Sequence, residues 1–131
     1  MARILVDTSV WIDFLSGELS SDHKDFLNKK IADRFVVLTD IIRHEILIGA
    51  RNHKDFNQLK SLLAPFEILR LDLDDLDDFD EFSWKLRLQG FRGKYTDVSI
   101  AYLSHKHKIP LMSFDSYFLH LAGKGILQLI R

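Results

Sequence analysis

The feature that most constrains this chain is the regular alternation of short apolar runs with helix-length stretches, in which apolar residues recur every three or four positions. Short runs of this kind fit buried strands, and strands separated by helices join through right-handed crossovers into a parallel sheet covered on both faces. We therefore expect an α/β fold, a three-layer α/β/α domain around a roughly five-stranded parallel sheet. The predicted strands are 4–6, 35–38, 66–71, 111–114 and 126–130. The predicted helices are one carrying Val10 to Leu15, then 19–32, 39–48, 54–63, 74–89 and one that begins at Thr96 or Asp97.

Size and composition indicate one domain, residues 1–131, because 47% hydrophobic residues suffice for a single core. The 18 basic and 19 acidic residues nearly cancel, so a nucleic-acid site would have to come from local arrangement. The absence of cysteine excludes disulfides and thiolate metal sites. The sequence has neither a leader pattern nor an apolar run of about 20 residues, so we expect a cytoplasmic protein with no membrane contact.

Four acidic residues stand where a predicted strand ends or the following helix begins: Asp7, Glu45, Asp97 and Asp115. In an open α/β sheet such positions share one edge, so these side chains are expected to form a cluster. Carboxylates held close together repel one another, and a divalent cation bound through oxygen relieves the repulsion. The sequence therefore predicts a Mg²⁺ or Mn²⁺ site formed by the four acids.

Helix capping is the alternative interpretation for Asp7, Asp97 and Asp115, since Asp is a favoured N-cap residue. A neighbouring hydroxyl residue, such as Ser9 beside Asp7, would cap equally well and leave the carboxylate free.

Glu45 does not fit a surface position, because in a helix it shares the inward face of Ile42. An ionised carboxylate on that face is costly unless it is paired or bound to metal, which favours metal ligation.

A dense acidic run, Asp72 to Glu81, is the competing acidic feature. It lacks the alternating ligands and central glycine of a calcium loop, and we interpret it as a solvated helix face. The six histidines show neither a metal-ligand spacing nor a Ser-His-Asp order, which favours structural roles.

Three segments together resemble the PIN-domain ribonucleases, and in particular the VapC-type toxins of toxin–antitoxin pairs. They are ILVDTSVWIDFL at 4–15, EILIGA at 45–50 and TDVSIAYLSHKHKIPLMSFDSYF at 96–118. The resemblance implies a PIN fold over the whole chain, with the four acids as metal-binding and catalytic residues. It also implies that Ser9 and Ser113 are small hydroxyl residues near the metals. Tyr117 departs from the family, because many relatives have an acid or an amide there; a second metal would then be held weakly or arrive with RNA.

As function, the resemblance implies a Mg²⁺- or Mn²⁺-dependent endoribonuclease that hydrolyses RNA phosphodiester bonds. It implies a cognate VapB-like antitoxin as partner and a homodimer within a larger toxin–antitoxin complex. Basic residues near the acids are candidates for contacts to RNA phosphates: Arg43, Arg51, Arg87, Arg92 and Lys94.

Three other functions remain open at this point. The chain could be a housekeeping PIN-domain nuclease that processes RNA, or a PIN scaffold without catalysis. A phosphoacceptor receiver domain also uses a parallel sheet and an acidic pocket, but it places paired acids after its first strand and a lysine after its last. Here Asp7 has no acidic neighbour and Lys124 precedes the last predicted strand, so the receiver interpretation is disfavoured.

Overall fold

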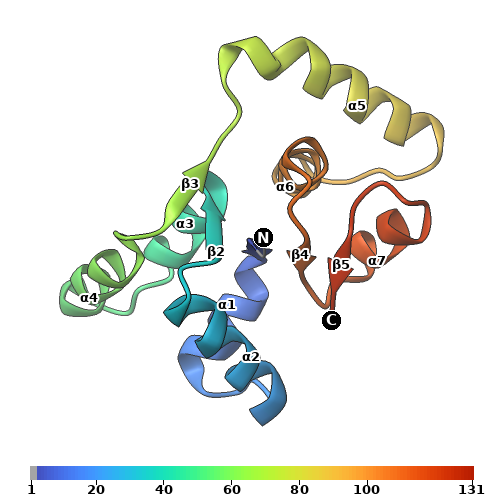
Figure 1. Ribbon diagram of the computed structural model, residues 1–131. Coiled ribbons are helices and arrows are strands. Elements are labelled where there is room, and N and C mark those ends of the chain that lie inside the picture. Colours follow the sequence, from blue (N-terminus) through green and yellow to red (C-terminus); the bar gives the residue numbers. More distant parts are fainter. Residues whose placement is uncertain (1–2) are drawn as a thin grey trace.

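The computed structural model describes residues 3–131, and its centre is a five-stranded sheet in which every strand is parallel to its neighbours (Figure 1). The strand order is β3-β2-β1-β4-β5. Leu5, in the middle of β1, is in register with Val37 of β2 on one side and Leu111 of β4 on the other. The strands are β1 (Ile4–Val6), β2 (Val36–Thr39), β3 (Glu67–Leu69), β4 (Leu111–Met112) and β5 (Leu129–Ile130).

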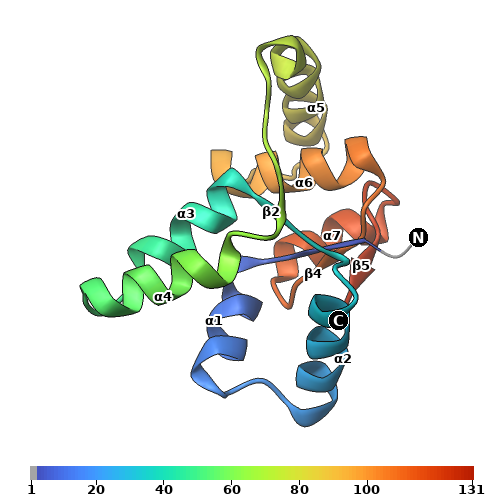
Figure 2. The same cartoon turned by 60° about the vertical axis from the view of Figure 1, so that its left-hand side comes forward.

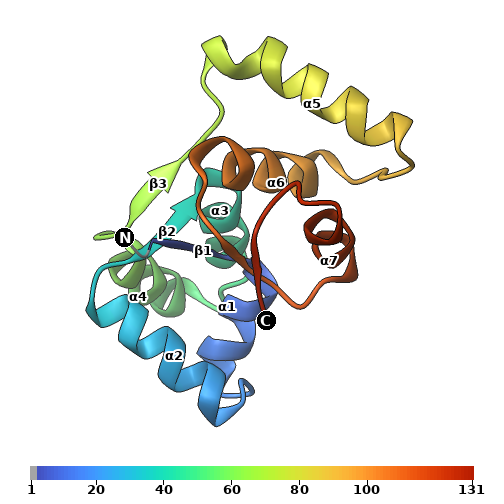
Figure 3. The same cartoon turned by 45° about the vertical axis from the view of Figure 1, so that its right-hand side comes forward.

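Helices cover both faces of this sheet, which confirms the predicted three-layer α/β/α architecture. The helices that connect β1, β2 and β3 lie on one side, and α6 and α7 lie on the other (Figures 1 and 3). Figure 2 shows that α5 lies on the outer side of α6, beyond the second helical layer. The helices are α1 (Thr8–Ser16), α2 (Ser21–Ala32), α3 (Asp40–Ile48), α4 (His53–Leu63), the 3₁₀ turn η1 (Leu73–Asp75), α5 (Leu76–Leu88), α6 (Tyr95–His107) and α7 (Ser116–Gly123).

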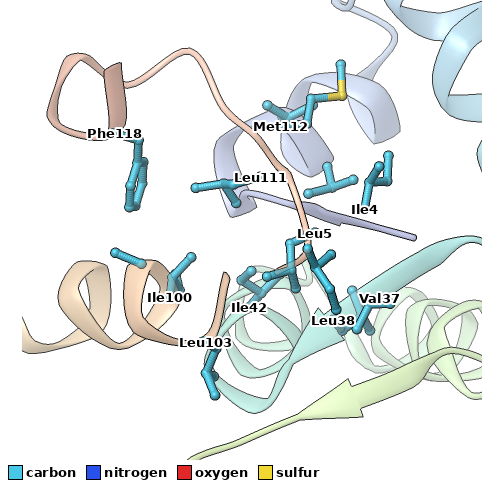
Figure 4. Packing of buried hydrophobic residues seen from close by; sticks show 14 of the residues in the cluster. Ile4, Leu5, Val37, Leu38, Ile42, Ile100, Leu103, Leu111, Met112 and Phe118 are labelled. Atoms are coloured by element: carbon cyan, nitrogen blue, oxygen red, sulfur yellow. The ribbon is translucent and has the colours of Figure 1, made fainter. Parts of the chain in front are cut away.

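The hydrophobic core fills both sides of the central strands. All three residues of β1 are buried, and so are all four of β2, as expected for strands covered on both faces. In Figure 4, Ile100 of α6 and Phe118 of α7 point toward the strands from the second helical layer. None of the described helices is long and apolar enough to cross a membrane.

The strand order reverses between β1 and β4, and this point fixes where a ligand site is expected. The chain moves outward from β1 to β2 and β3, then returns to place β4 on the other side of β1. In open α/β sheets, ligands bind at such a switch point, outside the carboxyl ends of the strands. Asp7 follows β1 directly, and Ser113 follows β4 directly, so both residues stand at this position.

Several predicted boundaries differ from the structure. The predicted strands 66–71, 111–114 and 126–130 shorten to Glu67–Leu69, Leu111–Met112 and Leu129–Ile130. Strand β4 stops at Met112 because Ser113 turns the chain, its hydroxyl oxygen accepting a hydrogen bond from the Asp115 N–H at 3.1 Å.

The solvated-face interpretation of the acidic run is wrong for Asp75, whose residue is only 7% exposed. Its carboxylate pairs with the Lys106 ammonium of α6 and accepts a hydrogen bond from the Asp72 N–H at 2.9 Å. Asp78 accepts a hydrogen bond from the Tyr102 hydroxyl at 2.7 Å. The run therefore helps to hold α5 onto α6, which its local pattern does not reveal.

Candidate active site

Asp7 is the most enclosed of the four candidate acids, with 8% of its surface exposed. It is the N-cap of α1, and its Oδ1 accepts a hydrogen bond from the Thr8 N–H at 2.9 Å. Its Oδ2 accepts from the Ser113 hydroxyl at 2.9 Å and from the Ser9 hydroxyl at 3.4 Å. Burial raises the pKa of the Asp7 carboxyl, and the hydrogen bond from Ser113 acts in the opposite direction.

The capping question raised by the sequence has a mixed answer. Asp7 and Asp115 do cap α1 and α7, yet each caps with one oxygen only. Ser9 is not the cap, because it donates to Asp7 Oδ2 instead. Capping and membership of an acidic cluster are therefore compatible at these positions.

Asp115 and Ser113 come from the turn between β4 and α7. Asp115 is exposed, and its Oδ1 accepts a hydrogen bond from the Tyr117 N–H at 2.9 Å. Its negative charge raises the pKa of Asp7 and that of Asp97, so all three carboxyl groups act on one another. The turn from β4 to α7 thus brings Ser113 and Asp115 to the switch point, where Ser113 donates to Asp7 at the end of β1.

Glu45 lies half-buried on α3, on the same face as Ile42 and Ile46, as its spacing predicted. Its Oε1 accepts a hydrogen bond from the Thr8 hydroxyl at 2.7 Å. Thr8 is a site residue that sequence reasoning missed, because a Thr after an Asp at a helix start fits ordinary capping. Its 37-residue separation from Glu45 gives no local signal.

Asp97 lies in the first turn of α6, which begins at Tyr95 with Lys94 as its N-cap residue. The prediction that Thr96 or Asp97 opens this helix was therefore wrong by one to two residues, because Lys94 takes the extended backbone of the cap without a side-chain hydrogen bond. Burial raises the pKa of Asp97 most, followed by the charges of Asp115 and Asp7, with Glu45 contributing least. Asp97 is therefore the residue on which the charges of the other three acids act together.

The donor set at this edge fits a hard divalent cation. It consists of carboxylate and hydroxyl oxygens, and two of its carboxyl groups have a raised pKa that a nearby positive charge would lower. Within residues 3–131, no three His, Asp or Glu side chains lie close enough together to hold a metal ion. Asp115 is exposed and Asp97 is half-buried.

The five basic residues predicted to contact RNA phosphates lie in different surroundings. Lys94 is placed by its effect on Asp97, whose pKa its charge lowers. Arg51, which precedes α4, has its Nε 3.8 Å from Oδ2 of Asp55 in the first turn of that helix. Arg43 is half-buried on α3, whereas Arg87 and Arg92 are exposed.

The surface has a groove between α1, α3 and α4 and a larger cavity between α6, α7 and β5. Only the groove is lined by one of the four acids. A groove of about 570 Å³ between α1, α3 and α4 is lined by Ile12, Leu15, Glu45 and Leu59, among others. A larger cavity of about 850 Å³ between α6, α7 and β5 contains none of the four acids. The larger volume is thus not the candidate active site.

Comparison with known proteins decides the family. The family model described as PIN domain matches residues 4–124. The chain belongs to the PIN domain family. The expected resemblance to this family is therefore confirmed, although no curated protein sequence matches the chain significantly.

Several solved structures are similar to this PIN domain. FitAcB from Neisseria gonorrhoeae has a TM-score of 0.78 and 22% sequence identity, covering 98% of this chain and 97% of that chain. A toxin-antitoxin complex from Klebsiella pneumoniae has a TM-score of 0.73 and 22% identity over the same shares of the two chains. VapBC-5 of the VapBC family of toxin-antitoxin systems, from Mycobacterium tuberculosis, has a TM-score of 0.65 and 20% identity, covering 100% of this chain and 99% of that chain. At these identities the likeness concerns the fold.

Proposed function

We propose that this PIN domain is a metal-dependent endoribonuclease that hydrolyses RNA phosphodiester bonds, and that it is the toxin of a toxin–antitoxin pair. The observation that carries the proposal is the grouping of the acids at the sheet switch point. The hydroxyls of Ser113 and Thr8 donate to Asp7 and Glu45 at 2.9 and 2.7 Å across distant segments, and the charges of Asp115, Asp7 and Glu45 raise the pKa of Asp97. Three acids that act on the carboxyl group of a fourth at a sheet switch point are costly in a protein without a cation. Such an arrangement is expected where a cation and a charged substrate bind.

The proposed role of this chain's own residues follows from their contacts. Ser113 and Thr8 orient the carboxylates of Asp7 and Glu45 through hydrogen bonds of 2.9 and 2.7 Å. Asp7, Glu45, Asp97 and Asp115 would hold Mg²⁺ or Mn²⁺. The chemistry supplied by the bound cation would be polarisation of the scissile phosphate and acidification of a water. Lys94 would neutralise substrate phosphate beside the acids.

An antitoxin is the partner that the similar structures suggest, since one comes from a toxin-antitoxin complex and another from a VapBC system. The groove between α1, α3 and α4 supports this proposal, because its apolar side chains lead to Glu45. It suits a segment with one apolar face and an arginine that reaches the acids.

A homodimer is the proposed assembly of the free toxin. Trp84 and Leu88, four residues apart on α5, are 57% and 68% exposed. Apolar side chains of this size on one helix face favour association. Sedimentation of Trp84→Glu beside the wild type tests this assembly, and equal masses for the two proteins would contradict it.

The decisive experiment measures cleavage of single-stranded RNA with Mg²⁺ or Mn²⁺ and with excess chelator. The wild type should cleave only with the metal, and Asp7→Asn should abolish cleavage while the fold is retained. Asp80→Asn is the matched control, because Asp80 is exposed on α5, away from the acids. Undiminished cleavage in chelator would exclude the metal mechanism, and no cleavage by the wild type would favour a non-catalytic scaffold.

The toxin assignment needs its own experiment. Expression of the chain alone should arrest growth, and co-expression of an adjacent small reading frame should relieve the arrest. Absence of arrest by a protein that cleaves RNA in vitro would instead favour a housekeeping RNA-processing nuclease.

A further inference from the structure

The connection between α5 and α6, residues 89–94, contains two of the basic residues proposed to contact RNA, Arg92 and Lys94, and the charge of Lys94 acts on Asp97. Hydrogen bonds fix its two ends. The Gly90 N–H donates to the Arg87 carbonyl oxygen at 3.0 Å, and the Val98 N–H donates to the Lys94 carbonyl oxygen at 2.9 Å. Arg92 and Lys94 lie between these fixed points, on either side of Gly93.

The backbone of Gly93 rests on the phenol end of Tyr117. A Cβ atom at Gly93 would lie 2.6 Å from Cζ and 2.6 Å from the hydroxyl oxygen of Tyr117, and 3.0 Å from a methyl carbon of Val98. Real Cβ atoms do not approach their neighbours this closely, so with a larger residue either the end of the Tyr117 ring or the Gly93 backbone would have to shift. Close packing, and not an unusual φ angle, is what requires glycine here.

Tyr117 is itself held between the connection and the acids. It is the second residue of α7, and its ring makes an edge contact with Phe118 at 5.4 Å between centroids. Its hydroxyl oxygen is buried and has no hydrogen-bond partner among the described residues. The Tyr117 backbone N–H donates a hydrogen bond to Asp115 Oδ1 at 2.9 Å, so the ring starts from the same turn as that acid.

We infer that Tyr117 is a positioning residue: its ring supports the Gly93 backbone and thereby holds Lys94 beside the acids, where Lys94 binds a phosphate of the RNA substrate. This inference rests on the proposed function and adds the residue that fixes the phosphate-binding cation. Tyr117 touches neither the metal nor the phosphate in this role. The position at which relatives carry a polar ligand would here serve to set the geometry of the connection.

A double-mutant cycle on melting temperature tests the contact without any need for activity. Gly93→Ala should lower the melting temperature in the wild type but produce little further loss in Tyr117→Leu, because the shorter side chain leaves room for the methyl group. Gly123→Ala is the control, since a Cβ there meets nothing within 4 Å and its φ angle is ordinary. Equal losses from Gly93→Ala in both backgrounds, or no loss beyond that of Gly123→Ala, would overturn the contact.

Binding of a fluorescein-labelled single-stranded RNA of mixed sequence, measured in chelator, tests the consequence. Lys94→Gln should weaken binding several-fold and reduce the slope of log K against log salt by about 0.7, the value for one phosphate contact on a single strand. Gly93→Ala should produce the same change, and adding Lys94→Gln to Gly93→Ala should change little more. The control Gly123→Ala should bind as the wild type does.

Binding that Lys94→Gln leaves unchanged, or additive losses from the two substitutions, would overturn the inference. Failure of the wild type to bind this RNA would overturn it as well. Neither measurement involves cleavage, so a wild type that binds but does not cleave would contradict the proposed nuclease while both tests still decide for or against the role of Tyr117.

Discussion

The Ser113 hydroxyl donates a hydrogen bond to Asp7 Oδ2 at 2.9 Å across 106 residues of sequence. This bond joins the ends of β1 and β4 at the point where the strand order reverses. Ser113 is fully buried, so its hydroxyl has no water at hand as a substitute partner. The bond therefore fixes one oxygen of the most enclosed acid and stabilises its ionised form.

We expect Ser113→Ala to shift the acidic limb of the pH–rate profile to higher pH. The hydrogen bond from Ser113 lowers the pKa of Asp7 against the effect of burial, so its loss raises that pKa further. Activity that needs ionised Asp7 then falls several-fold on the acidic side and recovers as the pH rises. The profile of kcat/KM against pH checks this, with the exposed Ser61→Ala as control; an unmoved acidic limb would contradict the role of Ser113.

We expect Asp97→Asn to raise the melting temperature of the metal-free protein at neutral pH. Burial and the neighbouring acids raise the pKa of Asp97, so folding favours its protonated form and stability falls as the pH rises from the unfolded value of 3.8 through the folded one. The neutral amide avoids this loss. The difference should vanish at about pH 3, where the wild-type carboxyl is protonated in both states.

Calorimetric scans in chelator and in Mg²⁺ measure this effect. Added Mg²⁺ should stabilise the wild type more than Asp97→Asn, because a ligand that binds only the folded state stabilises it. A mutant that melts lower than the wild type in chelator at neutral pH would show that repulsion within the cluster is not the dominant effect.

We expect Tyr117→Phe to keep the protein folded and to stabilise it by up to about 1 kcal/mol. The Tyr117 hydroxyl is buried without a partner, and removing an unsatisfied polar group removes its desolvation cost. The ring remains under Gly93, so RNA binding should not change. Urea unfolding measures the stability, and a clear loss would reveal a hydrogen bond from this hydroxyl in solution.

We expect Asp75→Asn to lower the melting temperature by a few degrees at neutral pH. The hydrogen bond from Lys106 keeps the pKa of Asp75 below its usual value of 3.8, so the pair adds stability above that value and loses it as the pH falls through the folded pKa. The amide can still accept from the Asp72 N–H, which isolates the charge effect. Asp74→Asn, at an exposed neighbour, is the control; equal losses in the two variants would exclude the ion pair as the cause.

Local sequence patterns were sufficient to predict the layers of the fold and the order of its strands along the chain. The apolar run Ile4–Val6 and the spacing that puts Glu45 on the face of Ile42 are local patterns. Their periodicity alone indicates which side chains are buried. The same patterns placed Asp7 and Asp115 at strand ends, where a parallel sheet brings such residues to one edge. The helix Ser116–Gly123 had no predicted range, although Asp115 was recognised as its possible cap.

Local patterns do not predict which side chains donate hydrogen bonds to the acids, nor which residues contact the connection beside them. The bonds from Ser113 to Asp7 and from Thr8 to Glu45 join distant segments. The contact of Gly93 with the Tyr117 ring joins the connection before α6 to the start of α7. Asp75 looked solvated until Lys106 was found beside it. Such contacts depend on how helices and strands pack in three dimensions, and the local periodicity of a sequence does not predict that packing.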